Sequence, residues 1–162
     1  RVQAAEVLAK RSAEILKKNP HMAIMALGDF NTSEENNPHP FKTVLFKDNL
    51  FTDIVLAAPK TKVPGTYYFG PKDQWNFLDH FFVNKVLMDG KELKVLLKSF
   101  EIYAPHFITH NLKKKIREGE QQNIKIVSAP KRFNPNGKTR KGIGYSDHFP
   151  ILVKLEYPDK VN

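Results

Sequence analysis

Hydrophobic residues recur at helical spacing in the first segment of the chain. Among Lys, Arg and Glu, the apolar positions stand at roughly helical spacing: Val2, Ala5, Leu8, Ala9, Ile15 and Leu16. This is the pattern of an amphipathic helix with one buried face. Asn19-Pro20 follows, and proline cannot continue a helix. The pattern therefore predicts a surface helix over residues 1–18 that packs on a core.

The next hydrophobic segment is short and continuous. Met22 to Leu27 contains no polar residue and is stopped by Gly28, which favours a strand buried on both faces over a helix of that length. Asp29 would then follow at the end of that strand. Residues 32–40 are rich in Ser, Glu, Asn and Pro and predict a loop, and residues 41–46 predict a short helix.

Further strands are predicted later in the chain. Residues 66–69 and 77–83 flank a Gly-Pro-Lys-Asp turn, which predicts a β-hairpin with Asp79 in its second strand. Residues 95–103 and 151–157 predict two more strands. Together the elements indicate a layered structure that contains both helices and sheets.

Composition limits the class of protein. A chain of 162 residues that is 41% hydrophobic has enough apolar material for one core, and its length argues against several independent domains. Because there is no cysteine, any metal must be held by oxygen or imidazole ligands. The longest apolar run is far shorter than the about 20 residues that a membrane-spanning helix needs, so we expect no membrane span.

The positive charge is concentrated in one stretch. The net charge is +9, and from Asn111 to Lys141 ten basic residues stand against two acidic ones. Such a stretch attracts polyanions such as nucleic acid or anionic lipid, but it also serves solubility alone. Charge by itself leaves both interpretations open.

Three short segments place polar, titratable residues directly beside apolar strands. They are Gly28-Asp29-Phe30-Asn31, Phe77-Leu78-Asp79-His80 and the segment Gly144 to Pro150, which contains Ser146-Asp147-His148-Phe149. Each has an ordinary structural explanation when taken alone: a cap or turn, a solvated strand residue, or the end of a loop. Their occurrence together, in this order, needs a further explanation.

The set of three segments resembles the endonuclease/exonuclease/phosphatase family, which includes abasic-site endonucleases, pancreatic-type deoxyribonucleases, sphingomyelinases and inositol polyphosphate phosphatases. The resemblance covers most of the chain. It implies a DNase I-like α+β fold, a four-layer α/β-sandwich in which two packed mixed β-sheets are flanked by helices. It also implies a Mg²⁺- or Mn²⁺-dependent phosphoric ester hydrolase.

The resemblance assigns a role to each matching residue. Asp29 would orient or deprotonate the attacking water, and Asn31 would hold a phosphate oxygen. Asp79 would orient the imidazole of His148, which would act as general base or stabilise charge on the phosphoryl oxygens. Asp147 would lie by the divalent cation.

These residue types suit the chemistry. A phosphodiester repels an incoming hydroxide, so hydrolysis needs a cation that neutralises charge and a positioned base that prepares the water. Lys138 and Arg140, in the basic stretch, are further predicted substrate-binding residues. No compartment can be inferred from the sequence.

The family's domain is usually about twice as long, and its first half supplies an Asn and a metal-binding Glu that have no counterpart here. The chain also opens at Arg1 inside the predicted helix, without an initiator Met or a cap. We therefore expect residues 1–162 to be the C-terminal portion of a single domain whose N-terminal half is missing. A separate chain is one possible source of that half.

The sequence thus predicts a metal-dependent phosphodiesterase, with a nuclease on DNA or RNA preferred because the basic stretch suits a phosphate backbone. Two alternatives stay open: hydrolysis of a lipid or inositol phosphate head group, and an inactive basic fragment that binds nucleic acid. Other residues give weaker signals. We expect His106 and His110 to be surface histidines. His80 should face away from Asp79, because neighbouring side chains alternate along a strand. The aromatic residues around Trp75 are predicted to lie in a core.

Overall fold

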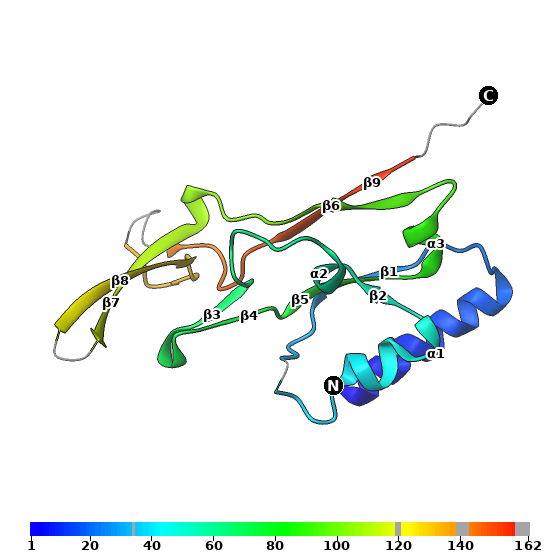
Figure 1. Ribbon diagram of the computed structural model, residues 1–162, viewed down its shortest axis with the longest axis horizontal. Coiled ribbons are helices and arrows are strands. Elements are labelled where there is room, and N and C mark those ends of the chain that lie inside the picture. The colour runs from blue at the N-terminus through cyan, green and yellow to red at the C-terminus, as the bar shows by residue number, and fades with distance from the viewer. Residues whose placement is uncertain (34, 119–120, 139–142, 158–162) are drawn as a thin grey trace. The chain divides into compact units, whose positions relative to one another are not determined.

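The computed structural model describes residues 1–33, 35–118, 121–138 and 143–157. The chain has a mixed α+β fold with several antiparallel sheets and few helices (Figure 1). It divides into two compact units: Arg1–Thr61, Phe77–Glu101 and Ile151–Asn162 form the first, and Lys62–Asn76 and Ile102–Pro150 form the second. In the part of the chain that the structure describes, none of the helices has the length and apolarity to cross a bilayer.

The first unit is built on a three-stranded antiparallel sheet. Its order is β1 (Met25–Asp29), β5 (Asp79–Val83) and β2 (Thr52–Asp53), so β5 is the central strand. Helix α1 (Val2–Lys18) and the single π-helical turn η1 (Phe41–Leu45) pack together in the same unit. The unit also contains η2 (Lys47–Asn49), α2 (Ile54–Ala57), α3 (Lys85–Asp89) and the paired strands β6 (Lys94–Ile102) and β9 (Ile151–Glu156).

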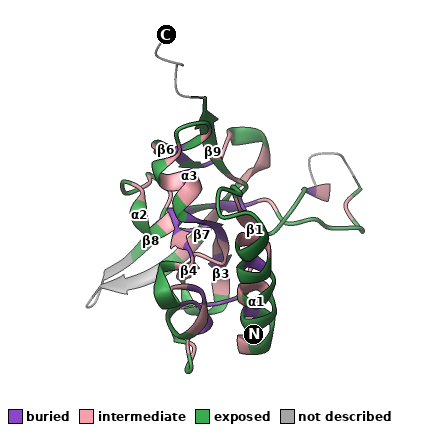
Figure 2. Ribbon diagram, turned by 90° about the vertical axis from the view of Figure 1, so that its right-hand side faces the viewer, coloured by how far each residue is buried: buried purple, intermediate pink, exposed green. Residues whose placement is uncertain are grey.

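Helix α1 confirms the amphipathic pattern. It ends at Lys18 before Asn19, and it buries Ala5 and Ser12 while most of its other residues are exposed (Figure 2). Its buried face meets an aromatic core centred on Phe82, which is fully buried on β5. The rings of Phe30 and Phe41 lie 4.8 Å and 4.7 Å from that of Phe82 and contact it by their edges. This core supports the sheet from which the candidate site projects.

The strand predicted at Met22 to Leu27 is present but shifted, and its predicted burial is wrong. The strand begins at Met25 because Met22 and Ile24 are bound by the buried side chain of Asn84 instead of a neighbouring strand: Ile24 N donates to Asn84 Oδ1 (3.0 Å) and Asn84 Nδ2 donates to Met22 O (2.8 Å). Leu27 is 64% exposed, so this edge strand is not buried on both faces.

The second unit contains the predicted turn, but the hairpin differs from the prediction. Strand β3 (Tyr67–Phe69) pairs with β4 (Gln74–Asn76) across the short 3₁₀ turn η3 (Gly70–Lys72). Asp73 closes the turn with φ of 53°, a conformation that Asp tolerates better than most residues. The sequence predicts residues 77–83 as the second strand of this hairpin, but β4 takes that place, and β5 pairs instead with β1 and β2.

Most of the basic stretch, for which the charge pattern predicts no secondary structure, forms a long hairpin. Strands β7 (Thr109–Glu118) and β8 (Gln121–Pro130) pair antiparallel in register (Figure 1). A short 3₁₀ turn, η4 (His106–Ile108), precedes them. Val127 and Ala129 of β8 are buried with Tyr68, and Trp75 packs against them, so these aromatic residues form the core of this unit.

Asp73 holds the hairpin against the β3–β4 turn. Its carboxylate accepts a hydrogen bond from the Tyr68 hydroxyl (2.5 Å) and lies 2.9 Å from Lys125 Nζ and 3.5 Å from Lys114 Nζ. The hydrogen bond from Tyr68, followed by that from Lys125, lowers the pKa of Asp73 from its ordinary value of 3.8 to about 2. Contact with Tyr68 likewise raises the pKa of Lys114.

The lowered pKa of Asp73 predicts a specific acid sensitivity. A carboxyl whose pKa falls on folding stabilises the folded state when ionised, so its contribution is present above about pH 4 and is lost as the pH falls toward 2. The difference in melting temperature between the wild type and Asp73→Asn should therefore shrink over that interval. Thermal unfolding followed by circular dichroism measures it, and a difference independent of pH would contradict this account.

Candidate active site

The Gly-Asp-Phe-Asn motif forms a compact turn at the end of β1. Gly28 has φ of 143°, which side chains rarely allow, although a Cβ there would meet no atom within 4 Å; the glycine is needed for its backbone conformation and not for space. Asn31 is left-handed with φ of 49°. Its backbone N donates to Asp29 Oδ1 (2.8 Å) and its side-chain Nδ2 donates to Asp29 Oδ2 (3.0 Å). The turn therefore fixes the Asp29 carboxylate and the Asn31 amide as one unit.

Phe30 anchors this turn to the core. Its backbone N donates to Leu78 O (2.8 Å), just before β5, and its ring packs on Phe82 and Phe41. Asp29, in contrast, is exposed. An apolar ring between two polar residues thus holds the turn in place while its polar groups stay accessible.

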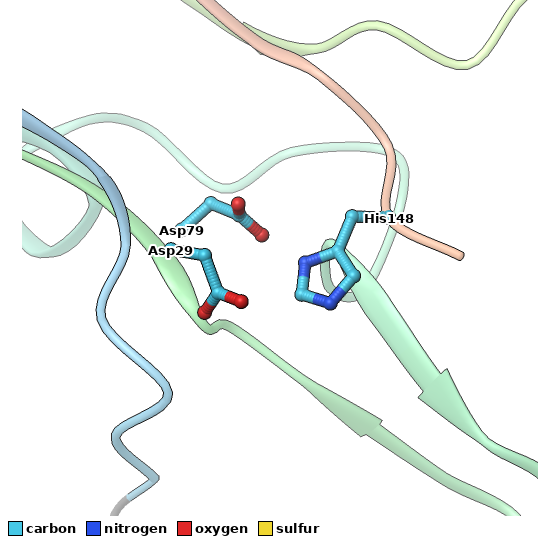
Figure 3. Close-up of side chains that lie close together, drawn as sticks. All are labelled: Asp29, Asp79 and His148. Atoms are coloured by element: carbon cyan, nitrogen blue, oxygen red, sulfur yellow. The ribbon is translucent and has the colours of Figure 1, made fainter. Parts of the chain in front are cut away.

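Asp29 and Asp79 face each other across the sheet. The register of β1 on β5 pairs the two residues directly, and each has a carboxylate oxygen within 4.8 Å of one on the other. Figure 3 shows both side chains projecting in the same direction from their strands. Two carboxylates this close repel each other when both are ionised, and a bound cation relieves that repulsion.

The donor set around this pair fits Mg²⁺ or Mn²⁺. Both ions prefer oxygen ligands, and Mg²⁺ is commonly held by one or two carboxylates with water completing its shell. Asp29 and Asp79 offer those carboxylates, and Asn31 is tied to the first of them. A cation here would supply positive charge where a phosphate ester must approach two acids.

The Ser-Asp-His-Phe-Pro segment lies in the second unit, and an aromatic residue anchors it as well. Phe149 is buried, its ring stacks on Trp75, and its backbone N donates to Thr66 O (2.8 Å). His148 forms a β-bridge with Tyr67, and the two rings lie 5.0 Å apart. The imidazole is therefore fixed on the face of a neighbouring strand, half-buried.

The other predicted residues are also in the second unit. Asp147 is exposed and lines a cavity with Arg132, while Lys138 is exposed in the segment that follows β8. Arg140 lies outside the described residues. His106 and His110 are exposed, as expected of surface histidines.

A buried pair that the sequence did not indicate supports Asp79. Next to it on β5, His80 is 5% exposed, and its Nδ1 lies 2.8 Å from Oδ2 of the buried Asp53. The other oxygen of Asp53 accepts from Val55 N and caps α2. His80 does face away from Asp79, as its position on a strand predicted. Its partner was missed because it lies 27 residues away, and no local spacing reveals such a contact.

Comparison with known proteins assigns the chain to a family. Residues 1–157 match the sequence model of the Endonuclease/Exonuclease/phosphatase family, and the chain belongs to that family. Among curated proteins and among solved structures, neither comparison gave a match. The family is generally hydrolytic on phosphate esters and typically depends on divalent metals, in agreement with the oxygen-rich pair formed by Asp29 and Asp79.

The carboxylate pair predicts stabilisation by a cation. With free Mg²⁺ or Mn²⁺ at about ten times its Kd, the free energy of unfolding should rise by about 1.4 kcal/mol. Asp29→Asn, which keeps an acceptor for Asn31, should lose this increase, as should Asp79→Asn. Asp89→Asn, an exposed acid on α3, is the matched control and should keep it. An equal increase in all four proteins, measured by thermal unfolding, would contradict a site at the pair.

Proposed function

We propose that this protein is a Mg²⁺- or Mn²⁺-dependent phosphodiesterase whose preferred substrate is DNA or RNA. The observation that carries the proposal is the pairing of Asp29 with Asp79 at the ends of adjacent strands, with Asn31 bound to the first carboxylate. Membership of a family of phosphoester hydrolases supports it. Nothing in a purely structural turn requires two acids to face each other.

In this proposal each residue has a separate role. Asp29 orients or deprotonates the attacking water, and Asn31 donates its remaining amide hydrogen to a phosphate oxygen. Asp79 orients the imidazole of His148, which takes up a proton or stabilises the charge that builds on the phosphoryl oxygens. Asp147 lies by the cation.

The exposed face of the β7–β8 hairpin supports nucleic acid as the substrate. Cross-strand pairs share a face of a hairpin, so Lys113 and Lys115 lie on one face and Lys114 on the other. The first two are exposed, whereas Lys114 is engaged by Asp73 and the carbonyl of Gly70. Two lysines two residues apart on a strand suit successive contacts with a phosphate backbone.

A second candidate is a phosphodiester in a lipid head group. Ile124 and Ile126, which are 66% and 61% exposed, stand opposite Lys115 and Lys113 on that same face. A surface that combines cationic and aliphatic side chains also suits an anionic bilayer. Binding to vesicles rich in anionic lipid that disappears on changing both isoleucines to Ser would favour this candidate.

We also propose the DNase I-like four-layer sandwich for the whole domain, with residues 1–162 as its C-terminal portion. The reason is that the family's early Asn and metal-binding Glu have no counterpart in this chain. A separate polypeptide that supplies the missing half is part of the same proposal. Copurification of such a chain would support it.

Cleavage of plasmid DNA in the presence of Mg²⁺ or Mn²⁺ tests the function. His148→Ala should reduce the rate about 10²- to 10⁴-fold, the usual contribution of a general base. His106→Ala, an exposed histidine of the same unit, should cleave like the wild type. Equal cleavage by His148→Ala and wild type would refute the role of His148. A wild-type protein that binds DNA without cleaving it would support the inactive, nucleic-acid-binding alternative instead.

Salt dependence tests the hairpin face. We expect Lys113 and Lys115 each to contact a phosphate of duplex DNA. Changing both to Gln should therefore make the plot of the log of the DNA association constant against the log of salt concentration less steep. The slope should change by about 0.9 for each phosphate that is no longer neutralised. Changing Lys10 and Lys17, two exposed lysines of α1, to Gln removes the same charge elsewhere and should leave the slope nearly as it is. Fluorescence anisotropy at several salt concentrations gives both slopes, and equal effects of the two double variants would argue against the exposed face.

A further inference from the structure

A cavity in the second unit shares only Asp147 with the residues used in the function proposed above. Its volume is about 430 Å³, and its lining includes the cationic residues Lys131 and Arg132, the polar residues His110 and Asn134, and one acid, Asp147. Asp147, one of the lining residues, directly precedes His148 in sequence. The other lining residues are uncharged, so the two cations outnumber the one acid, and this excess of positive charge favours an anionic ligand.

Arg132 is held in position by two contacts of its guanidinium group. Its Nη2 donates to the carbonyl of Tyr68 (3.2 Å), and its Cζ lies 5.3 Å from the centre of the Tyr67 ring. The imidazole of His148 packs on that same ring at 5.0 Å. Arg132 and His148 thus contact a common aromatic residue, which places a cation beside the histidine that the proposed reaction uses.

The charge of Arg132 is available to a ligand. Within the described part of the chain, Arg132 has no carboxylate within salt-bridge distance, whereas Lys114 and Lys125 share Asp73. One hydrogen bond to a carbonyl uses one of its five N–H donors, so the planar fork can still bind two oxygens of a phosphate. A lysine in its place would offer the charge without that fork.

We propose that the Arg132 cavity binds a second, non-scissile phosphate of the substrate. This proposal rests on the phosphodiesterase function proposed above and deepens it, because it makes a neighbouring phosphate a determinant of specificity. Two kinds of substrate carry such a group: a nucleic acid strand, and a phosphorylated inositol head group. Both present a tetrahedral phosphate with anionic oxygens to the guanidinium.

Two matched substrate pairs test the proposal and separate its two sources. The first pair is a dithymidine monophosphate with and without a 5′-terminal phosphate, and the second is glycerophosphoinositol with and without a 4-phosphate. In one pair the wild type should prefer the member with the extra phosphate by about tenfold in kcat/KM, the usual effect of a charge-assisted hydrogen-bonding pair. Arg132→Gln should reduce that preference to about one, and Arg132→Lys should keep part of it.

Lys10→Gln, an exposed lysine of α1, removes the same charge and should keep the full preference. Circular dichroism checks that each variant is folded. Hydrolysis without any preference in either pair, or a preference that survives Arg132→Gln, would overturn the inference and leave the phosphodiesterase function standing.

If the wild type hydrolyses none of the four compounds, the proposed function fails for them, and binding decides the inference separately. Isothermal titration with inorganic pyrophosphate should then show at least about tenfold weaker binding to Arg132→Gln than to wild type. Equal affinities of the two proteins would overturn it.

Discussion

The register of β1 on β5 is the constraint on which the candidate site depends. Because side chains alternate along a strand, a slip of one residue would turn Asp29 away from Asp79 and move Phe82 out of the core. The register is fixed at both ends of the pair. Asn84 binds the backbone of residues 22 and 24 at one end, and Phe30 N binds Leu78 O at the other. The ladder between them has little freedom to shift.

A common local arrangement makes both polar motifs accessible without loosening them. In the first motif, Phe30 stands between Asp29 and Asn31 in sequence and packs against the core. In the second, Phe149 directly follows His148 and is buried. Each aromatic residue also donates its backbone N–H to a neighbouring carbonyl. The apolar anchor supplies the stability, so the adjacent acid or imidazole does not have to be buried. This matters because burying two carboxylates together would cost far more than leaving them at the surface.

The sequence predicted those features that depend on neighbours along the chain. The helix over residues 1–18 and the position of Asp29 at a strand end follow from spacing, from Pro20 and from Gly28, and the structure confirms them. Family membership was predicted from three short motifs that occur in a fixed order along the chain, and the match to the family's sequence model confirms it. The predicted strand partner of residues 79–83 was wrong. The turn at Gly70 suggested a local hairpin, whereas the actual partner, β1, is some 50 residues away in sequence.

Contacts between distant residues also explain what the charge pattern left undecided. Counting lysines along the basic stretch treats every cation alike, but pairing into a hairpin separates them onto two faces. On one face, Asp73 pairs with Lys114 and Lys125, offsets part of their charge and holds the hairpin to the turn that contains Asp73. On the other, Lys113 and Lys115 keep their charge in solvent. Part of the positive surplus is therefore structural, and only the remainder is free to recognise a phosphate.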